Sequence, residues 1–99
     1  MTIEEVRAEI TQIDEEIIRL IAQRQNLAKK VATVKQTEGI PVHDNQRKTD
    51  VLEYVMKLAK ANHVDPVPIK TIFETLISMN EKEQRATMGK SVPPKRIVR

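Results

Sequence analysis

Six polar side chains interrupt or border the apolar stripes of this 99-residue sequence, and their types could bind an anion. Four are cations, two are amides and none is an acid: Arg7, Arg24, Lys35, Arg47, Asn80 and Gln84. Arg24 is the most informative, because it follows Leu20 on a helical seam where an apolar residue is expected. Burying a guanidinium is costly unless an anion meets it. The set favours a site for a compact dianion, such as a dicarboxylate, held by forked guanidinium contacts.

The same residue types limit the chemistry of such a site. They include no general base and no nucleophile, and the chain has no cysteine. The two histidines, His43 and His63, lie twenty residues apart without the spacing of metal ligands, so we expect no metal site. Catalysis would depend on holding one conformer of the ligand and on stabilising charge that develops in the transition state. The alternative is that each of the six is only a solvated surface side chain.

Helices must position these residues, because apolar residues recur at steps of three and four and no segment shows the alternation of a strand. The sequence predicts an all-α fold with one long N-terminal helix and two shorter ones. The expected ranges are 3–36, 45–62 and 66–87. We expect a single helical domain over residues 1–88 and a basic, disordered tail over residues 89–99.

Capping residues stand at the expected helix boundaries. The N-cap candidates are Thr2, which forms a capping-box pattern with Glu5, together with Asp44 and Asp65, and the stop signals are Gly39, Pro41 and Gly89. Agreement between caps and periodicity supports the three predicted helices.

The long helix carries an apolar seam that needs a partner of similar length. The seam consists of Ile3, Val6, Ile10, Ile13, Ile17, Leu20, Leu27, Val31 and Val34. Arg7 and Lys35 lie on one flank of it, 28 residues or about 42 Å apart, so they cannot touch one small ligand within one chain. An antiparallel partner helix would bring its Arg7 beside Lys35. We therefore expect an antiparallel helical homodimer with two shared sites.

The charge distribution argues against nucleic acid as a partner. The chain has 17 basic and 14 acidic residues, but four of the basic residues lie in the segment 89–99, and without them 13 basic residues face 14 acidic ones. One Phe and one Tyr offer little for base stacking. No stretch approaches the roughly 18 apolar residues of a membrane span, and the N-terminus begins in an acidic amphipathic helix. We expect a cytoplasmic protein that binds neither nucleic acid nor membrane.

Over residues 3–86 the sequence resembles the all-helical chorismate mutases. The matching motifs are Arg7 with Ile13-Asp14, the run from Leu20 to Arg24, Leu27-Ala28, Val31, Lys35, Ile40-Pro41-Val42, Asp44, Arg47, Phe73, Ile77, Asn80 and Gln84. The resemblance implies intertwined dimers of three-helix chains that rearrange chorismate to prephenate, in phenylalanine and tyrosine biosynthesis, without a cofactor.

The resemblance also implies roles for particular residues. Arg24 and the partner's Arg7 are similar to the clamps of the two carboxylates, and Lys35 and Gln84 to the pair that contacts the ether oxygen of the breaking bond. The catalytic residues would be Lys35, Gln84 and Arg24. The implied substrate-binding residues are the partner's Arg7, Arg24, Lys35, Asp44, Arg47, Lys48, Asn80 and Gln84.

Lys48 departs from the family pattern, because many members carry a glutamate there that orients the substrate hydroxyl. Three explanations are open: either Asp44 orients the substrate hydroxyl alone, or Lys48 turns to solvent, or the substrate preference of this chain differs. A differing preference leaves room for pyruvate elimination from isochorismate on the same fold. A third alternative is a helical dimer that binds an anionic metabolite without turnover. The resemblance further allows non-covalent docking onto a partner enzyme of aromatic biosynthesis.

Overall fold

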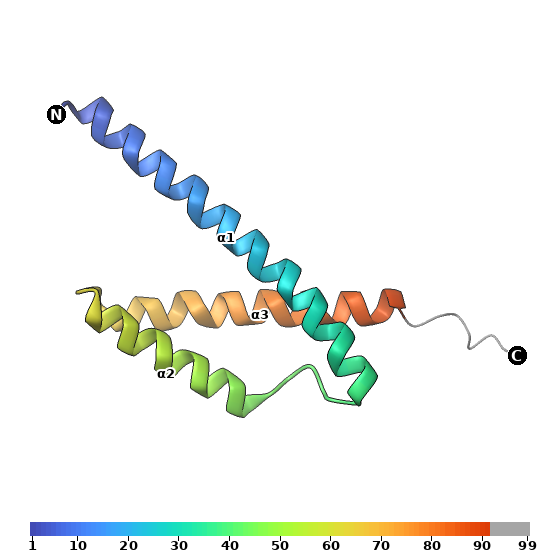
Figure 1. Ribbon diagram of the computed structural model, residues 1–99. Coiled ribbons are helices and arrows are strands. Elements are labelled where there is room, and N and C mark those ends of the chain that lie inside the picture. The colour runs from blue at the N-terminus through green and yellow to red at the C-terminus, as the bar shows by residue number, and fades with distance from the viewer. Residues whose placement is uncertain (92–99) are drawn as a thin grey trace, which may run out of the picture.

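The computed structural model describes residues 1–91, and these form three helices joined by two short connections (Figure 1). The helices are α1 (Ile3–Glu38), α2 (Asn45–Ala61) and α3 (Pro66–Ser91), with no strand among the described residues. The predicted all-α class with one long and two shorter helices is confirmed. The predicted end of the third helix at Gly89 is wrong, because α3 continues to Ser91. The rest of the expected tail, residues 92–99, lies outside the described residues.

Side chains cap the helices where the sequence predicts. The Thr2 hydroxyl accepts a hydrogen bond from the Glu5 backbone N–H, and the Glu5 carboxylate accepts one from the Thr2 N–H, at 3.1 and 2.7 Å. These bonds lower the pKa of Glu5. Asp44 and Asp65 each accept a backbone N–H bond of 3.0 Å, from Arg47 and Val67 respectively.

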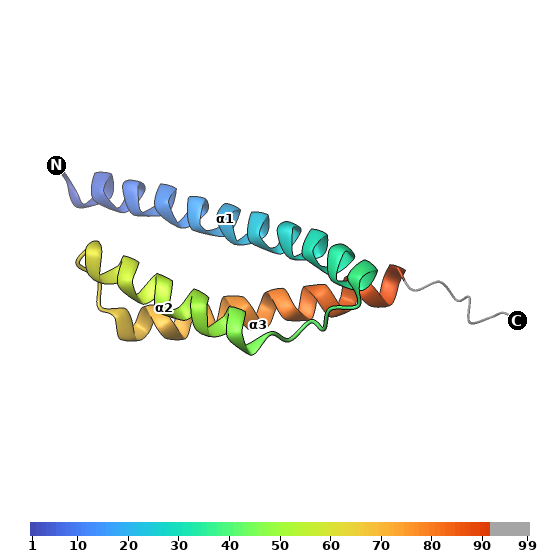
Figure 2. The ribbon, with the colours of Figure 1, turned by 60° about the horizontal axis from the view of Figure 1, so that its bottom comes forward.

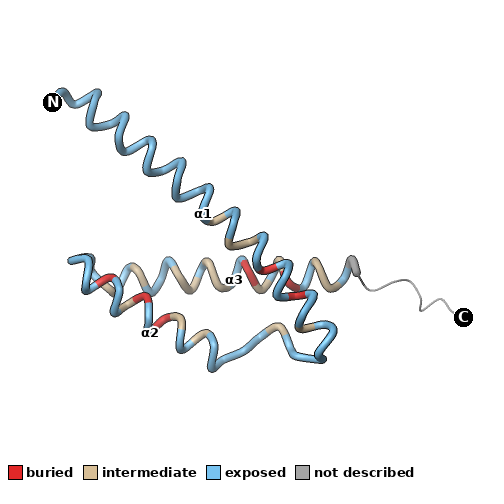
Figure 3. Tube along the Cα trace, viewed as in Figure 1, coloured by how far each residue is buried: buried red, intermediate tan, exposed pale blue. Residues whose placement is uncertain are grey.

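Helix α3 lies against both of the other helices, whereas α1 and α2 do not contact each other within residues 1–91 (Figure 2). The buried apolar side chains are small in number: Ala28, Ala32, Leu52, Val55 and Ala59. The alanines of α1 stand one turn apart and allow α3 to pack closely. Figure 3 shows that the buried residues lie on α2 and, on α1 and α3, where these two helices cross. Within residues 1–91, this crossing is the only part of α1 that the other helices cover.

The apolar seam of α1 stays exposed in the single chain. Every seam residue from Ile3 to Val34 is exposed, and residues 3–20 include none that is buried or half-buried (Figure 3). The contact with α3 uses a different face of α1, marked by Ala28 and Ala32. The radius of gyration is 18.0 Å, against about 13 Å for a compact domain of this length. The chain is therefore an elongated unit with a long unpartnered apolar face.

The spacing of apolar residues predicts an inward face with Val51, Val55 and Leu58 on α2 and one with Ile69, Ile72, Phe73, Leu76 and Ile77 on α3. Two of these residues, Leu58 and Ile72, are instead 47% and 50% exposed. Within residues 1–91 α2 packs against α3 alone, and its buried residues include Leu52 and Ala59, beside the predicted face.

None of the three helices combines the length and the apolar character needed to cross a membrane, as judged over the described residues.

Candidate active site

A cavity of about 470 Å³ lies among the three helices. Seven of the eight predicted site residues line it: Arg24, Lys35, Asp44, Arg47, Lys48, Asn80 and Gln84. They come from the C-terminal half of α1, from the connection before α2, from the first turn of α2 and from one face of α3. Residues up to 60 positions apart in the sequence, Arg24 and Gln84, thus line the same cavity.

Arg24 meets an amide instead of an acid. Its Nη1 donates a hydrogen bond to Asn80 Oδ1, and its guanidinium lies 5.9 Å from the centre of the Phe73 ring. Burial lowers the pKa of Arg24, and the positive charge of Arg47 lowers it further. No carboxylate within residues 1–91 forms an ion pair with it. The guanidinium is partly desolvated and keeps its charge available to an anion in the cavity.

The two amides of α3 stand one turn apart and are almost fully enclosed. Asn80 is 7% exposed and Gln84 is 8% exposed. The Gln84 Oε1 is buried and has no hydrogen-bond partner among the described residues. A buried polar atom without a partner costs about 1–3 kcal/mol, so it calls for a group from outside the chain.

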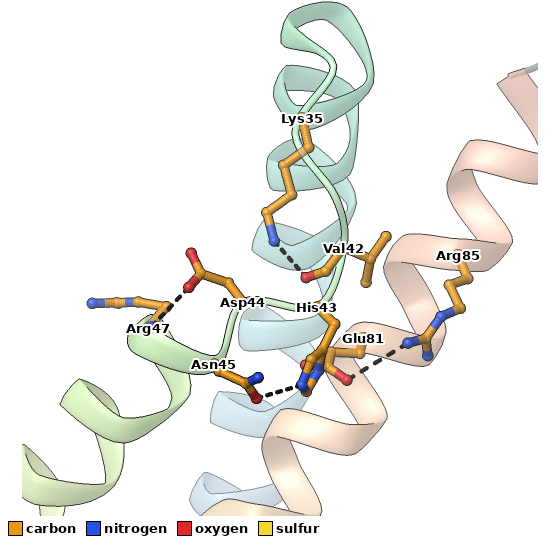
Figure 4. Close-up of polar contacts among 8 residues, drawn as sticks. All are labelled: Lys35, Val42, His43, Asp44, Asn45, Arg47, Glu81 and Arg85. Atoms are coloured by element: carbon orange, nitrogen blue, oxygen red, sulfur yellow. Dashed lines mark hydrogen bonds and ion pairs between the residues drawn. The ribbon is translucent and has the colours of Figure 1, made fainter.

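Lys35 is anchored by the connection between α1 and α2. Its Nζ donates a 2.8 Å hydrogen bond to the Val42 carbonyl (Figure 4). An ammonium has three N–H donors, so this bond uses only one of them. The others can serve an oxygen in the cavity while the first fixes the direction of the side chain.

Asp44 and its neighbours on α2 divide their roles between fold and cavity. The Asp44 carboxylate caps α2 through the Arg47 backbone N–H, while the Arg47 side chain is exposed at the rim. Lys48 is half-buried and lines the cavity.

Glu81 is a cavity residue that the sequence analysis missed. Its Oε2 lies 3.0 Å from His43 Nδ1, and its side chain is 17% exposed. It continues the row Phe73 and Ile77 at four-residue spacing, so extending that row by one turn would have found it. The cavity thus contains carboxylates, whereas the six residues first singled out include none.

Arg7 lies outside the cavity of its own chain. It stands on the exposed half of α1, 17 residues or about 25 Å from Arg24 along the helix. No side chain of this length spans that distance. An Arg7 that reaches a cavity must come from another copy of the chain.

The cavity can bind a dianion and order it. Its lining has four cations, Arg24, Lys35, Arg47 and Lys48, against the two carboxylates Asp44 and Glu81. No three histidine, cysteine or acidic side chains are grouped to hold a metal ion in the described part of the chain. The cavity lining can therefore bind a ligand through positive charge, amide groups and the shape of the cavity.

Comparisons with known proteins agree with one another. A family model described as chorismate mutase type II matches residues 6–85. The chain is 42% identical to the chorismate mutase of Methanocaldococcus jannaschii over 82 residues, which are 82% of each chain. It is 34% identical over 83 residues to the bifunctional chorismate mutase/prephenate dehydratase of Escherichia coli K12. It is 30% identical over 94 residues to the protein of the same name from Aquifex aeolicus.

The coverage differs between these relatives. The matches take in 84% and 88% of this chain but only 22% and 26% of the two bifunctional proteins. The chain therefore corresponds to most of the M. jannaschii protein and to a minor part of the other two.

Proposed function

Because the chain belongs to the type II chorismate mutase family, we propose that it rearranges chorismate to prephenate in the cavity among α1, α2 and α3. The chain is an isomerase by its family. One observation supports this cavity as the active site: Arg24, Lys35, Arg47 and the buried amides all line it. This set complements a dicarboxylate that carries an ether oxygen.

The rearrangement occurs within one molecule, breaking a C–O bond and forming a C–C bond without proton transfer. The protein must hold the compact conformer and favour the charge that grows on the ether oxygen. Arg24, kept charged beside an amide, would bind one carboxylate. The Lys35 ammonium and the Gln84 amide N–H groups would donate to the ether oxygen. Asp44 and Arg47 would lie near the substrate hydroxyl, and Asn80 would contact a carboxylate.

The second carboxylate clamp would be the partner's Arg7, in an intertwined homodimer. The exposed seam of α1 supports this assembly, because an apolar face of that length is stable only against another apolar surface. An antiparallel copy would cover the seam and carry Arg7 to the far cavity. The cytoplasmic location and docking onto a partner enzyme remain predictions.

Lys48 favours one second candidate, pyruvate elimination from isochorismate. Its half-buried place on the cavity wall adds a cation where the family pattern has an acid. Such a change can alter which ring substituent is bound.

The test is to incubate the purified chain with chorismate and with isochorismate, follow the loss of ultraviolet absorbance, and identify products by chromatography. We expect prephenate from chorismate. We expect Lys35→Ala to lose roughly a hundredfold or more in turnover while staying helical, because it removes charge stabilisation of the transition state. Lys29→Ala, an exposed lysine of the same helix, is the matched control and should behave as wild type.

Pyruvate release from isochorismate without prephenate formation would move the chain to the second candidate. Binding of chorismate without any product would leave a metabolite-binding dimer and contradict the proposed activity.

A further inference from the structure

His43, in the connection between α1 and α2, contacts one residue of α2 and one residue of α3. Its Nδ1 lies 3.0 Å from Glu81 Oε2 on α3, and its Nε2 lies 2.7 Å from Asn45 Oδ1 at the first residue of α2 (Figure 4). Both ring nitrogens are engaged although the ring itself is 47% exposed. The side chain thus connects the start of α2 to the middle of α3.

The residue before His43 supplies the anchor of Lys35. Within the described part of the chain, residues 41–43 make no backbone–backbone hydrogen bond outside helices, whereas Ile40 N–H still donates to Lys35 O at 2.8 Å. Side chains therefore hold the Val42 carbonyl in place. The Lys35 ammonium contacts it from one side, and the His43 ring fixes the next residue from the other.

Glu81 lies between the two amides of the cavity on α3. It directly follows Asn80 and precedes Gln84 by three residues, and all three line the cavity. A bond from Glu81 to His43 therefore ties the segment that orients Lys35 to the helix that carries Gln84.

We propose that His43 and Glu81 are positioning residues, which hold the Val42 carbonyl and, through it, aim the Lys35 ammonium at the ligand opposite Gln84. This inference rests on the role proposed above for Lys35. It assigns the pair no contact with the reacting atoms. A misplacement of the ammonium by about 1 Å would cost up to roughly a hundredfold in rate.

Arg85 provides a matched control on the same carboxylate. Its Nη2 lies 3.8 Å from Glu81 Oε1, and its side chain is 59% exposed. An exposed pair at that distance contributes little. Within residues 1–91, Arg85 forms no ion pair with residues 42–45.

The experiment compares His43→Leu, Glu81→Leu, Glu81→Gln and Arg85→Ala by steady-state kinetics on chorismate, with circular dichroism to check folding. The leucine variants should lower kcat roughly ten- to a hundredfold with KM within about twofold, because the carboxylate clamps remain. The double variant with leucine at both positions should lose no more kcat than the less active single variant, because each single substitution already removes the same bond between His43 and Glu81. Glu81→Gln keeps an acceptor for His43 and should lose less kcat than Glu81→Leu. Arg85→Ala, outside the cavity, should stay within about threefold of wild type.

A second readout observes Lys35 without turnover. In protein labelled with ¹⁵N-lysine, the Lys35 ammonium signal should be sharp in wild type and in Glu81→Gln and broadened by exchange in both leucine variants. If a leucine variant loses its helical circular dichroism, Asn45→Ala replaces it, since it removes one contact of the His43 ring outside the cavity. It should also lower kcat.

The outcomes separate this inference from the proposed function. Leucine variants with wild-type kcat and an unchanged Lys35 signal, beside an inactive Lys35→Ala, would overturn the positioning role and leave the active site intact. A fully active Lys35→Ala would remove the role of Lys35 and this inference with it. Formation of prephenate by the wild-type chain would stand in either case.

Discussion

A half-buried arginine that contacts an amide is the defining residue of this cavity. Arg24 donates to Asn80 and lies over the Phe73 ring, while burial and the charge of Arg47 lower its pKa. An internal carboxylate would have neutralised it, whereas a neutral amide orients the guanidinium without cancelling its charge. Its planar fork matches a carboxylate, and lysine cannot reproduce both the fork and the stacking on Phe73.

We predict that Arg24→Lys lowers kcat/KM for chorismate roughly ten- to a hundredfold although the positive charge is kept, because a charged hydrogen bond of the forked pair is lost. Kinetics and circular dichroism on the same sample would check this. Arg19→Lys, which changes an exposed arginine of the same helix paired with Glu16, should change neither quantity. Equal activity of Arg24→Lys and wild type would show that Arg24 acts only as a point charge.

At the end of α2, backbone hydrogen bonds hold a residue in a conformation that its type does not favour. The Val64 N–H donates to Ala59 O at 2.8 Å and the His63 N–H to Lys60 O at 3.1 Å, which is the bonding of a Schellman motif. That motif needs a left-handed residue, and His63 takes it with φ of 60°. The first helix ends with a residue suited to this region, Gly39, at φ of 71°.

We predict that His63→Gly raises the free energy of unfolding by about 1 kcal/mol, because glycine adopts a positive φ without the steric cost borne by a side chain. Urea unfolding at one fixed protein concentration would measure it. Gly39→Ala should lower the free energy of unfolding by a similar amount. A Cβ at this position would meet no atom within 4 Å, so the loss would come only from the positive φ of the backbone. A loss of stability in His63→Gly would mean that the His63 side chain makes a stabilising contact in the assembled protein.

The whole molecule is organised around a surface that the single chain leaves bare. Its extents are 68 × 29 × 16 Å, and one half of α1 extends away from the other helices (Figure 1). That half contains Arg7 and the exposed seam residues from Ile3 to Leu20. A chain of this shape buries little of its own apolar surface, so we attribute most of its stability to assembly. The same assembly would complete the cation set of each cavity.

We predict that mixing inactive Arg7→Ala with inactive Lys35→Ala restores about a quarter of the wild-type activity. Half of the dimers would be hybrids, and each hybrid would hold one complete cavity, with Lys35 from one chain and Arg7 from the other. Activity would be measured after partial unfolding and refolding of the mixture, with subunit exchange verified by a mass-tagged copy. Verified exchange without recovery would contradict the shared-cavity arrangement.

Local rules in the sequence determined the helices, because periodicity, capping side chains and turn residues act within a few positions of one another. The start of α1 at Thr2 and the stop at Gly39 needed no knowledge of the fold. The local rules erred at Gly89, where α3 passes through a glycine that costs a helix only about 1 kcal/mol. Most of the cation and amide set was also visible, since a polar residue on an apolar stripe is a local signal.

Only the tertiary structure decided which faces meet. The contact of α1 with α3 through Ala28 and Ala32, beside the seam, depends on how two helices cross, which periodicity does not state. The bond between His43 and Glu81 joins residues 38 positions apart, and no local pattern in the sequence pairs them. The length of the first helix already separated Arg7 from Lys35 in the sequence, whereas only the structure shows that α2 and α3 close the cavity around Arg24 and Lys35.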